Sequence, residues 1–353
     1  MPKDIIVYTK IDAKPRPAEV LDILLISTAE EKPLKLYRDL NVIKEDYGEA
    51  AIAQMAEALF NQPHTLADTL IRKVKIMGIA TPESPEAMLA AIEALREKDN
   101  DWYMLLTDKH EDEYIKALAA WAERTEPTEA ELGAGIEDHR KFYFAQTDNQ
   151  ELGISNPRCA IIYTDNPEEY ADAAYVGNVG PFYPKSVTWK FKRPDGISVP
   201  DLTDAQRDAL EEANVNFFTR EYKYEYIKNG VCADGNFIDV QLGADYITNY
   251  MRDELYRVRL ENAKISYEDA GFTTIATAVY NALNRATALG IIALDPESKI
   301  GVYTVHIPKR ADATDEEART RRMPDIVWEA VLAGDVHSVK VKGRLSVSLA
   351  EAA

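Results

Sequence analysis

The stretch VKIMGIATPESPEAMLAAIEALREKDNDWYMLLT, residues 74–107, indicates the fold class of the chain. It begins and ends with short apolar runs, VKIMGIA and WYMLLT, which are typical of buried strands. Between them, Ser84 and Pro85 are residue types favoured at the N-cap and the first position of a helix. Apolar residues then recur with helical spacing as far as Leu95. The order strand, helix, strand predicts a βαβ unit with parallel strands.

The same alternation extends on both sides of this unit. Apolar runs predict strands at residues 21–28, 141–147 and 159–164, and one-sided apolar spacing predicts helices at residues 49–60 and 111–123. Strands that alternate with helices at this spacing are typical of an α/β domain. We therefore predict an α/β domain with a layered, largely parallel sheet.

The chain beyond about residue 185 has a mixed pattern. Helical spacing predicts helices at residues 203–213, 245–263 and 271–290, and strand-like runs occur at residues 217–230 and 301–308. In the first of these runs, Tyr222, Tyr224 and Tyr226 alternate and are expected to share one strand face. Gly334 and Asp335 predict a hairpin turn between two final strands. The C-terminal part is therefore expected to be α+β.

Both ends of the chain carry a segment with strand-like alternation. Ile5 and Val7 lie in one such segment, and the prolines at positions 15 and 17 that follow are typical of an extended linker. In the C-terminal segment, serine, lysine and arginine occupy one parity and apolar residues the other, namely Val339, Val341, Leu345 and Val347. Two interpretations remain open. The C-terminal strand completes a sheet of its own domain, or it adds to the sheet of a neighbouring copy by β-augmentation.

Composition argues against several classes of partner. The 353 residues carry a formal net charge of −19, which disfavours nucleic acid because phosphate recognition needs a basic surface. The segment from 299 to 344 is an exception, with nine Lys and Arg against seven Asp and Glu. No apolar run approaches the roughly 20 residues of a membrane-spanning helix. Two cysteines without CxxC spacing and an N-terminus without a signal-peptide core favour a soluble protein made in a cytoplasm.

One acidic pattern is compatible with an enzyme. Asp108, Asp148 and Asp165 each follow a predicted strand and precede a Glu by three residues. Ligands bind beyond the carboxyl ends of parallel strands, where three carboxylates could hold Mg²⁺. The same spacing is that of a helix capping box, which carries no chemistry. The five histidines lack metal-binding spacing, and the chain contains no P-loop, dinucleotide fingerprint or GxSxG motif. We predict no catalytic residue, cofactor or metal ion, and the alternative is a soluble Mg²⁺-dependent α/β enzyme.

Two long stretches carry a family resemblance. The first, GNFIDVQLGADYITNYMRDELYRVRLENAKISYEDAGFTTIATAVYNALNRATALGII, covers residues 235–292. The second, ARTRRMPDIVWEAVLAGDVHSVKVKGRLSV, covers residues 318–347. Their motifs and order resemble the C-terminal half of the contractile tail sheath proteins of bacteriophages and of R-type bacteriocins. The runs DWYMLL, ALAAW and KFYFAQT upstream fit the same family, so that the resemblance extends over essentially the whole chain.

The resemblance implies a division of the chain into four parts. These are an N-terminal arm (1–20), an outer α/β domain (21–245), an inner C-terminal domain (246–335) and a C-terminal arm strand (336–353). In this family both arms complete sheets of neighbouring subunits, which implies sheath–sheath contacts for Ile5, Val7, Val339, Val341, Leu345 and Val347. The basic stretch before the last hairpin implies tube or intersubunit contacts for Arg319, Arg321 and Arg322.

The resemblance also implies a structural function without enzymatic activity. Sheath subunits form stacked hexameric rings in a helical lattice around a tail tube, and contraction drives the tube through the envelope of a target cell without nucleotide hydrolysis. The implied partners are other copies of the chain, the tube protein, and baseplate and tail terminator proteins, with no nucleic acid and no membrane insertion. The implied location is the tail sheath of a phage or phage-tail-like particle, assembled in the cytoplasm of the host bacterium.

Overall fold

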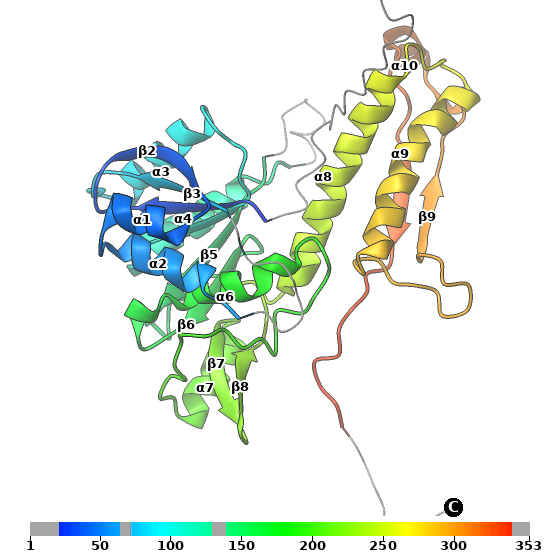
Figure 1. Cartoon of the computed structure of the whole chain (residues 1–353). Helices are drawn as coiled ribbons and strands as arrows, with labels where there is room; N and C mark the ends of the chain where they lie inside the picture. The colour runs from blue at the N-terminus through cyan, green and yellow to red at the C-terminus, as the bar shows by residue number, and fades with distance from the viewer. Residues whose placement is uncertain (1–20, 64–70, 72, 129–138, 341–353) are drawn as a thin grey trace, which may run out of the picture.

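The computed structural model describes residues 21–63, 71, 73–128 and 139–340. An α/β body contains an eight-stranded sheet, and a pair of long helices with a two-stranded sheet lies beside it (Figure 1). The strand order of the large sheet is β2-β3-β1-β4-β5-β6-β7-β8. The bounds are β1 (Ile23–Ser27), β2 (Lys32–Tyr37), β3 (Val74–Gly78), β4 (Met104–Thr107), β5 (Phe142–Thr147), β6 (Cys159–Tyr163), β7 (Asn216–Glu221) and β8 (Tyr224–Lys228).

The predicted largely parallel sheet is confirmed. The inner strands β3, β1, β4, β5, β6 and β7 pair in parallel, whereas β2 and β8 pair antiparallel at the two edges. The strands β1 and β6 are buried at every position. Strands that are buried on both faces have nearly continuous apolar sequences, and this explains the runs seen in the sequence.

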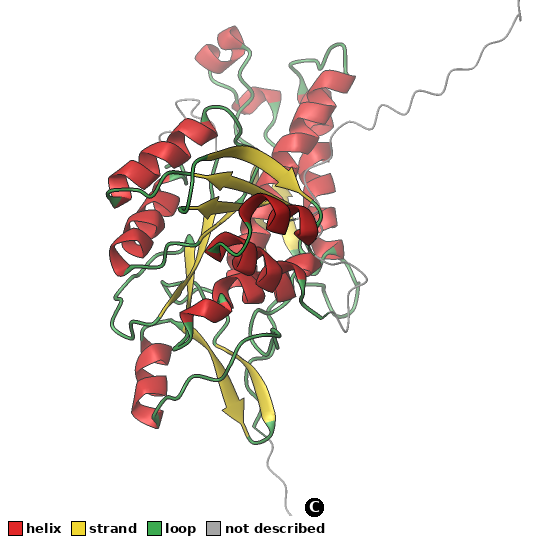
Figure 2. Cartoon of the chain, turned by 60° about the vertical axis from the view of Figure 1, so that its left-hand side comes forward, coloured by secondary structure: helices red, strands yellow, loops and turns green. Residues whose placement is uncertain are grey.

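Helices cover both faces of this sheet (Figure 2). Ile23 and Leu25 of β1 lie in the core with α1 (Leu40–Tyr47), α2 (Ala51–Phe60) and α6 (Ala171–Val179). Leu24 and Ile26 point to the opposite face and lie in the core with α3 (Pro85–Arg96), α4 (Asp112–Arg124) and α7 (Asp204–Glu212). The predicted cap of α3 is confirmed, because Ser84 Oγ accepts a hydrogen bond from the N–H of Ala87. Short 3₁₀ helices are η1 (Pro167–Glu169), η2 (Gly180–Phe182) and η3 (Arg310–Asp312).

The C-terminal part forms a core of its own. Helices α8 (Ile238–Glu261) and α9 (Asp269–Ala288) run side by side, and the antiparallel strands β9 (Tyr303–His306) and β10 (Val327–Ala330) pack beside them. The short helix α10 (Asp315–Thr320) connects the two strands at the far end of the helix pair (Figure 1). Because α8 runs unbroken through residue 245, it joins the α/β body to this C-terminal part.

Two local predictions are wrong. No hairpin forms at Gly334 and Asp335, since residues 333–340 contain no strand. Instead, the N–H of Val331 bonds to the carbonyl of Val302, and the N–H of Ala333 bonds to that of Ile291. The three tyrosines of residues 222–226 do not share a strand face either. Tyr222 occupies the β7–β8 turn with a positive φ of 56° and is fully exposed, which leaves only the other two tyrosines in β8.

Candidate assembly surfaces

Among the described residues, no further strand pairs with either edge of the sheet of β9 and β10. Within the described ranges, the two strands pair only with each other, and the neighbouring bridges, Ile292 with Leu332 and Leu294 with Gly301, lie beyond their ends. An open edge presents a row of unpaired N–H and C=O groups that can pair with a further strand. The ribbon is therefore suited to accept an added strand on either side.

One face of this ribbon is covered and the other is exposed. Tyr303, Val305, Trp328 and Ala330 pack against the core of α8 and α9. The outward positions of the two strands are Thr304, His306, Val327 and Glu329. Further exposed apolar side chains lie in the segments next to the strand ends, namely Leu294, Ile300, Val331 and Leu332. Exposed apolar side chains gathered in one region are typical of a protein–protein contact surface. Exposed apolar side chains thus flank the ends of the two strands whose edges are open.

The three predicted arginines lie together at the far end of the helix pair. Arg319 lies in the last turn of α10, Arg321 is the C-cap in the left-handed conformation with φ 57°, and Arg322 follows. The side chains of Arg319 and Arg322 are 75% and 68% exposed. Arg319 pairs with Glu316, and Arg322 Nη2 lies 3.9 Å from Asp325 Oδ1. Since these pairs are exposed, they contribute little stability and leave the guanidinium groups accessible to a partner.

The backbone fixes the position of this arginine cluster. The hydroxyl of Tyr267, from the turn between α8 and α9, donates to the carbonyl of Arg322 at 2.6 Å. The N–H of Arg310 donates to Asp269 Oδ1 at 2.6 Å. Thr314 and Glu317 form a capping box that begins α10. The arginines are therefore held on the tip of the helix pair.

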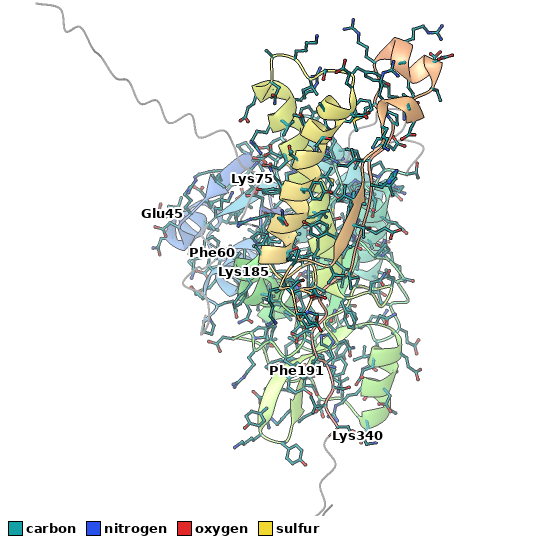
Figure 3. The ribbon with its side chains drawn as sticks, turned by 90° about the vertical axis from the view of Figure 1, so that its right-hand side faces the viewer. Glu45, Phe60, Lys75, Lys185, Phe191 and Lys340 are labelled. Atoms are coloured by element: carbon teal, nitrogen blue, oxygen red, sulfur yellow. The ribbon has the colours of Figure 1, made fainter. Side chains whose placement is uncertain are left out.

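Most of the predicted arm residues lie outside the described residues. These are Ile5, Val7, Val341, Leu345 and Val347. Val339 is described, and it is 77% exposed in a segment without regular structure. Figure 3 shows the labelled Lys340 at the end of this segment, at the opposite end of the molecule from helix α10 of Figure 1. In the single chain the described part of the C-terminal arm is thus not part of a sheet.

The acidic residues at the strand ends hold loops. Asp108 accepts hydrogen bonds from the N–H and the hydroxyl of Thr28, both at 2.9 Å, and its pKa is raised because it is buried. Asp165 accepts from the N–H of Asp201 at 2.8 Å, and Asp148 is exposed. In the part of the chain that the structure describes, no three His, Cys, Asp or Glu side chains are grouped as a metal site would require. The Mg²⁺ alternative therefore has no supporting geometry.

The capping-box interpretation of these strand ends is wrong as well. The N-cap of α4 is Glu111, and its side chain makes no capping hydrogen bond. The hydroxyl oxygens of Thr107, Thr147 and Thr164 each accept from the N–H two residues further along the chain. Such local side-chain hydrogen bonds stabilise turns, as an alternative to regular secondary structure. The spacing of Thr, Asp and Glu here marks loop turns.

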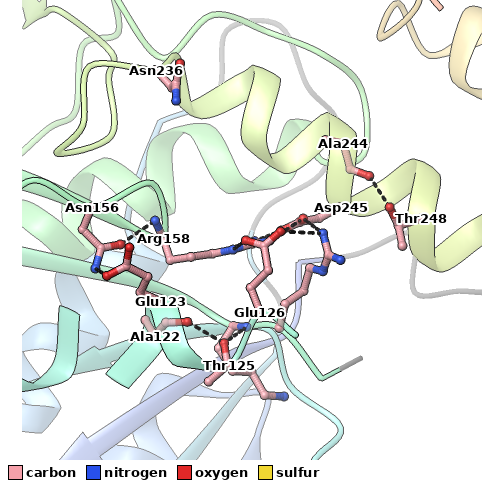
Figure 4. A network of polar contacts seen from close by, with 12 residues as sticks. Ala122, Glu123, Thr125, Glu126, Asn156, Arg158, Asn236, Ala244, Asp245 and Thr248 are labelled. Carbon is pink, nitrogen blue, oxygen red and sulfur yellow. Dashed lines mark hydrogen bonds and ion pairs between the residues drawn. The ribbon is translucent and has the colours of Figure 1, made fainter. Parts of the chain in front are cut away.

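A buried ionic network joins the α/β body to α8 (Figure 4). Asp245 of α8 accepts two hydrogen bonds from the guanidinium of Arg158, one of them from Nη2 at 3.0 Å. It also accepts from Arg140 Nη1 at 3.1 Å and from the hydroxyl of Tyr103 at 2.5 Å. Arg158 Nε donates in turn to Glu126 at 2.6 Å. Since Arg158 and Asp245 are both almost completely buried, each charge depends on the other.

The electrostatics of the network follow from this burial. Burial opposes the charge on Arg158, but the carboxylate of Asp245 outweighs it and raises the pKa of the guanidinium. Burial and the charge of Asp245 also raise the pKa of Tyr103, so its hydroxyl stays a donor. Sequence reasoning missed this network because Arg158 and Asp245 lie 87 positions apart. The available signals were an arginine directly before a wholly apolar strand and an aspartate between the apolar positions of a helix.

Comparison with solved structures shows that the chain has the fold of contractile sheath proteins. A chain in the structure of the anti-feeding prophage baseplate matches with a TM-score of 0.62 and 15% identity over 97% of this chain and 98% of that one. The sheath complex of an extracellular contractile injection system in the contracted state matches with a TM-score of 0.55 and 11% identity over 98% and 99% of the two chains.

A third match is the sheath tail protein from Desulfitobacterium hafniense, with a TM-score of 0.54 and 9% identity over 92% of this chain and 99% of that chain. No family model matches the chain, and no curated protein matches it in sequence. Among the described helices, none has the length and apolar character needed to cross a bilayer. The resemblance seen in the sequence is thus confirmed at the level of the fold.

Proposed function

We propose that this chain is a structural subunit of a contractile sheath that polymerises as stacked hexameric rings around a tail tube. The observation that carries the proposal is the open β9–β10 ribbon, found in a fold that sheath proteins share over nearly the whole chain. Contraction of the lattice drives the tube through a target cell envelope. The work comes from repacking between subunits, so the chain acts without nucleotide hydrolysis and is not an enzyme.

In this proposal the two arms link the subunits. The N-terminal arm, residues 1–20, and the strand within the C-terminal arm, residues 336–353, add to the β9–β10 edges of neighbours. Ile5, Val7, Val339, Val341, Leu345 and Val347 supply the apolar side chains that set the register. The hydrogen bonds and apolar burial of one added strand are roughly offset by the entropy of ordering it, about 1–2 kcal/mol per residue. Assembly is therefore cooperative, since each subunit both donates and accepts strands.

The remaining surfaces receive roles in the same particle. The inner domain, residues 246–335, faces the tube, and the outer domain, residues 21–245, faces away from it. Arg319, Arg321 and Arg322 contact the tube or a neighbouring subunit through their exposed guanidinium groups, and a terminator and a baseplate close the two ends of the sheath. The particle is a phage tail or a phage-tail-like particle assembled in the bacterial cytoplasm.

Electron microscopy of the purified chain tests the proposal. We expect the full chain to form tubes or rings, and a chain without residues 341–353 to stay monomeric and folded. The triple variant Val341→Ser, Leu345→Ser, Val347→Ser should also remain monomeric, because it removes the apolar face of the arm. The matched control, Ser346→Ala with Ser348→Ala, changes the opposite face and should assemble normally. Tubes of normal appearance from the truncated chain would overturn the role of the arm.

A further inference from the structure

The segment that leads from β10 to the C-terminal arm contacts the α/β body through the side chain of His337. Residues 334–340 run from the C-terminal ribbon towards β7 and β8, along the course marked by the labelled Phe191 and Lys340 in Figure 3. Every residue of this segment is exposed except His337. Val336 is 68% exposed and Val339 is 77% exposed. The contrast makes His337 the point at which this segment is held.

His337 is held by one hydrogen bond and two aromatic contacts. Its Nε2 lies 2.8 Å from Oγ1 of Thr188, which is itself buried. Its ring meets the ring of Phe237 edge-on at a centroid distance of 4.6 Å, and that of Phe191 at 6.4 Å. Edge-to-face pairs of this kind are favourable beyond the area that they bury. The imidazole is thus held on its apolar and its polar sides at once.

The partners of His337 are themselves fixed within the α/β body. Phe191 has a left-handed backbone with φ 61°, and its N–H bonds to the carbonyl of Ile227 in β8 at 3.0 Å. Its ring also packs on Tyr226 at 5.1 Å. Phe237 is the N-cap residue of α8. A non-glycine residue persists at positive φ only where its surroundings enforce that conformation. The receptor for His337 is therefore a preformed part of the body.

We infer that His337 is the positioning residue of the C-terminal arm, and that the part of the arm handed to a neighbour begins at Ser338. This inference rests on the proposed sheath function. A fixed point of departure limits the volume that the arm explores and raises its effective concentration at the acceptor edge. It also fixes the register of the added strand. A slip of one residue would turn the apolar side chains to the opposite face of the sheet. Loss of the anchor should weaken assembly about tenfold without unfolding the body.

The attachment can be measured without any polymer. Spin labels are placed at Lys116→Cys, on the exposed side of α4, and at Lys340→Cys, and the distance distribution is recorded by pulsed electron resonance on dilute monomer. We expect one narrow distribution for the parent and for the control Val336→Ala, which alters an exposed neighbour. His337→Ala should broaden the distribution, and Thr188→Val should broaden it less, because the ring contacts remain. A narrow distribution in His337→Ala overturns the anchor.

The role in assembly is then read from the critical concentration for polymerisation. We expect His337→Ala to raise it about tenfold, Val336→Ala to leave it unchanged, and His337→Phe, which retains aromatic packing, to restore part of the loss. Broadened distances in His337→Ala with an unchanged critical concentration would overturn the positioning role and leave the sheath proposal standing. A parent chain that never polymerises, with or without a tube, would overturn the sheath proposal and the positioning role together, while the distance measurement would still decide the attachment.

Discussion

Removal of Asp245 is the sharpest test of how the α/β body is joined to the helix pair. This carboxylate receives hydrogen bonds from Arg158, Arg140 and Tyr103, and so forms the ionic contact between α8 and the α/β body. In Asp245→Ala the guanidinium of Arg158 stays buried but loses its main counter-charge. Breaking a buried ion pair from one side costs about 3–5 kcal/mol.

The contacts that remain in Asp245→Ala narrow the expected loss of unfolding free energy. Arg158 keeps its ion pair with Glu126, whose side chain is 37% exposed and can move with the guanidinium. The loss of unfolding free energy from the broken ion pair is therefore expected at the low end of the range, about 3 kcal/mol. The hydroxyl of Tyr103 loses its acceptor, which adds about 1 kcal/mol. The expected total of about 4 kcal/mol is a large share of a typical unfolding free energy of about 5–15 kcal/mol.

Urea unfolding of the monomeric chain measures this loss from the midpoint and its slope. Asp148→Ala, which removes an exposed carboxylate, is the matched control and should change the unfolding free energy by less than about 0.5 kcal/mol. The double variant Arg158→Met with Asp245→Leu should recover a good part of the loss, because no unpaired charge remains between these two positions. A loss below about 1 kcal/mol in Asp245→Ala, or an equal loss in the control, would refute the reasoning.

Two further predictions concern buried titratable groups. Burial, and secondarily the charge of Arg96, lowers the pKa of Lys141 to about 7, below its unfolded value of about 10.4, so the unfolded state binds more protons between these limits. The free energy of unfolding therefore rises with pH from about 7 to about 10, by up to roughly 1.4 kcal/mol per pH unit. The variant Lys141→Met should lack this rise when the unfolding free energies of variant and parent are measured at each pH. An equal rise of the unfolding free energy in both proteins would show that Lys141 is not the titrating group. Burial raises the pKa of the thiols of Cys159 and Cys232, so a thiol reagent at pH 8 should label neither in the folded chain and both in denaturant, and rapid labelling of the folded chain would contradict their burial.

The sequence was most informative where burial is complete. The strands β1, β4 and β6 are buried on both faces, and their uninterrupted apolar runs predicted them directly. Helix α8 is different, since it begins at Ile238, seven positions before the predicted start. Gly243 lies in this first part, where a β-carbon would come within 2.8 Å of the side chain of Ile291. Glycine lowers helix propensity, but the close packing that it permits here favours the helix.

The candidate surfaces were only partly predictable for a related reason. The alternation in the C-terminal arm is a local property and can be read from neighbouring residues. The anchor of His337 combines Thr188, Phe191 and Phe237, and the buried network joins Arg158 to Asp245. Such contacts depend on how the chain brings distant segments together, and no local spacing encodes them. At the acidic strand ends the spacing of Thr, Asp and Glu was a local pattern but an ambiguous one. It fits a metal site, a helix cap and a loop turn equally well.

The proposed sheath assembly requires that the C-terminal arm pairs with another subunit. A cryo-electron microscopy map of the polymer, at a resolution that traces the main chain, measures this directly. We expect the strand that contains Val341, Leu345 and Val347 to lie hydrogen-bonded beside β9 or β10 of an adjacent subunit, with His337 still seated on its own body. A map in which that strand pairs only with the sheet of its own chain would contradict the account.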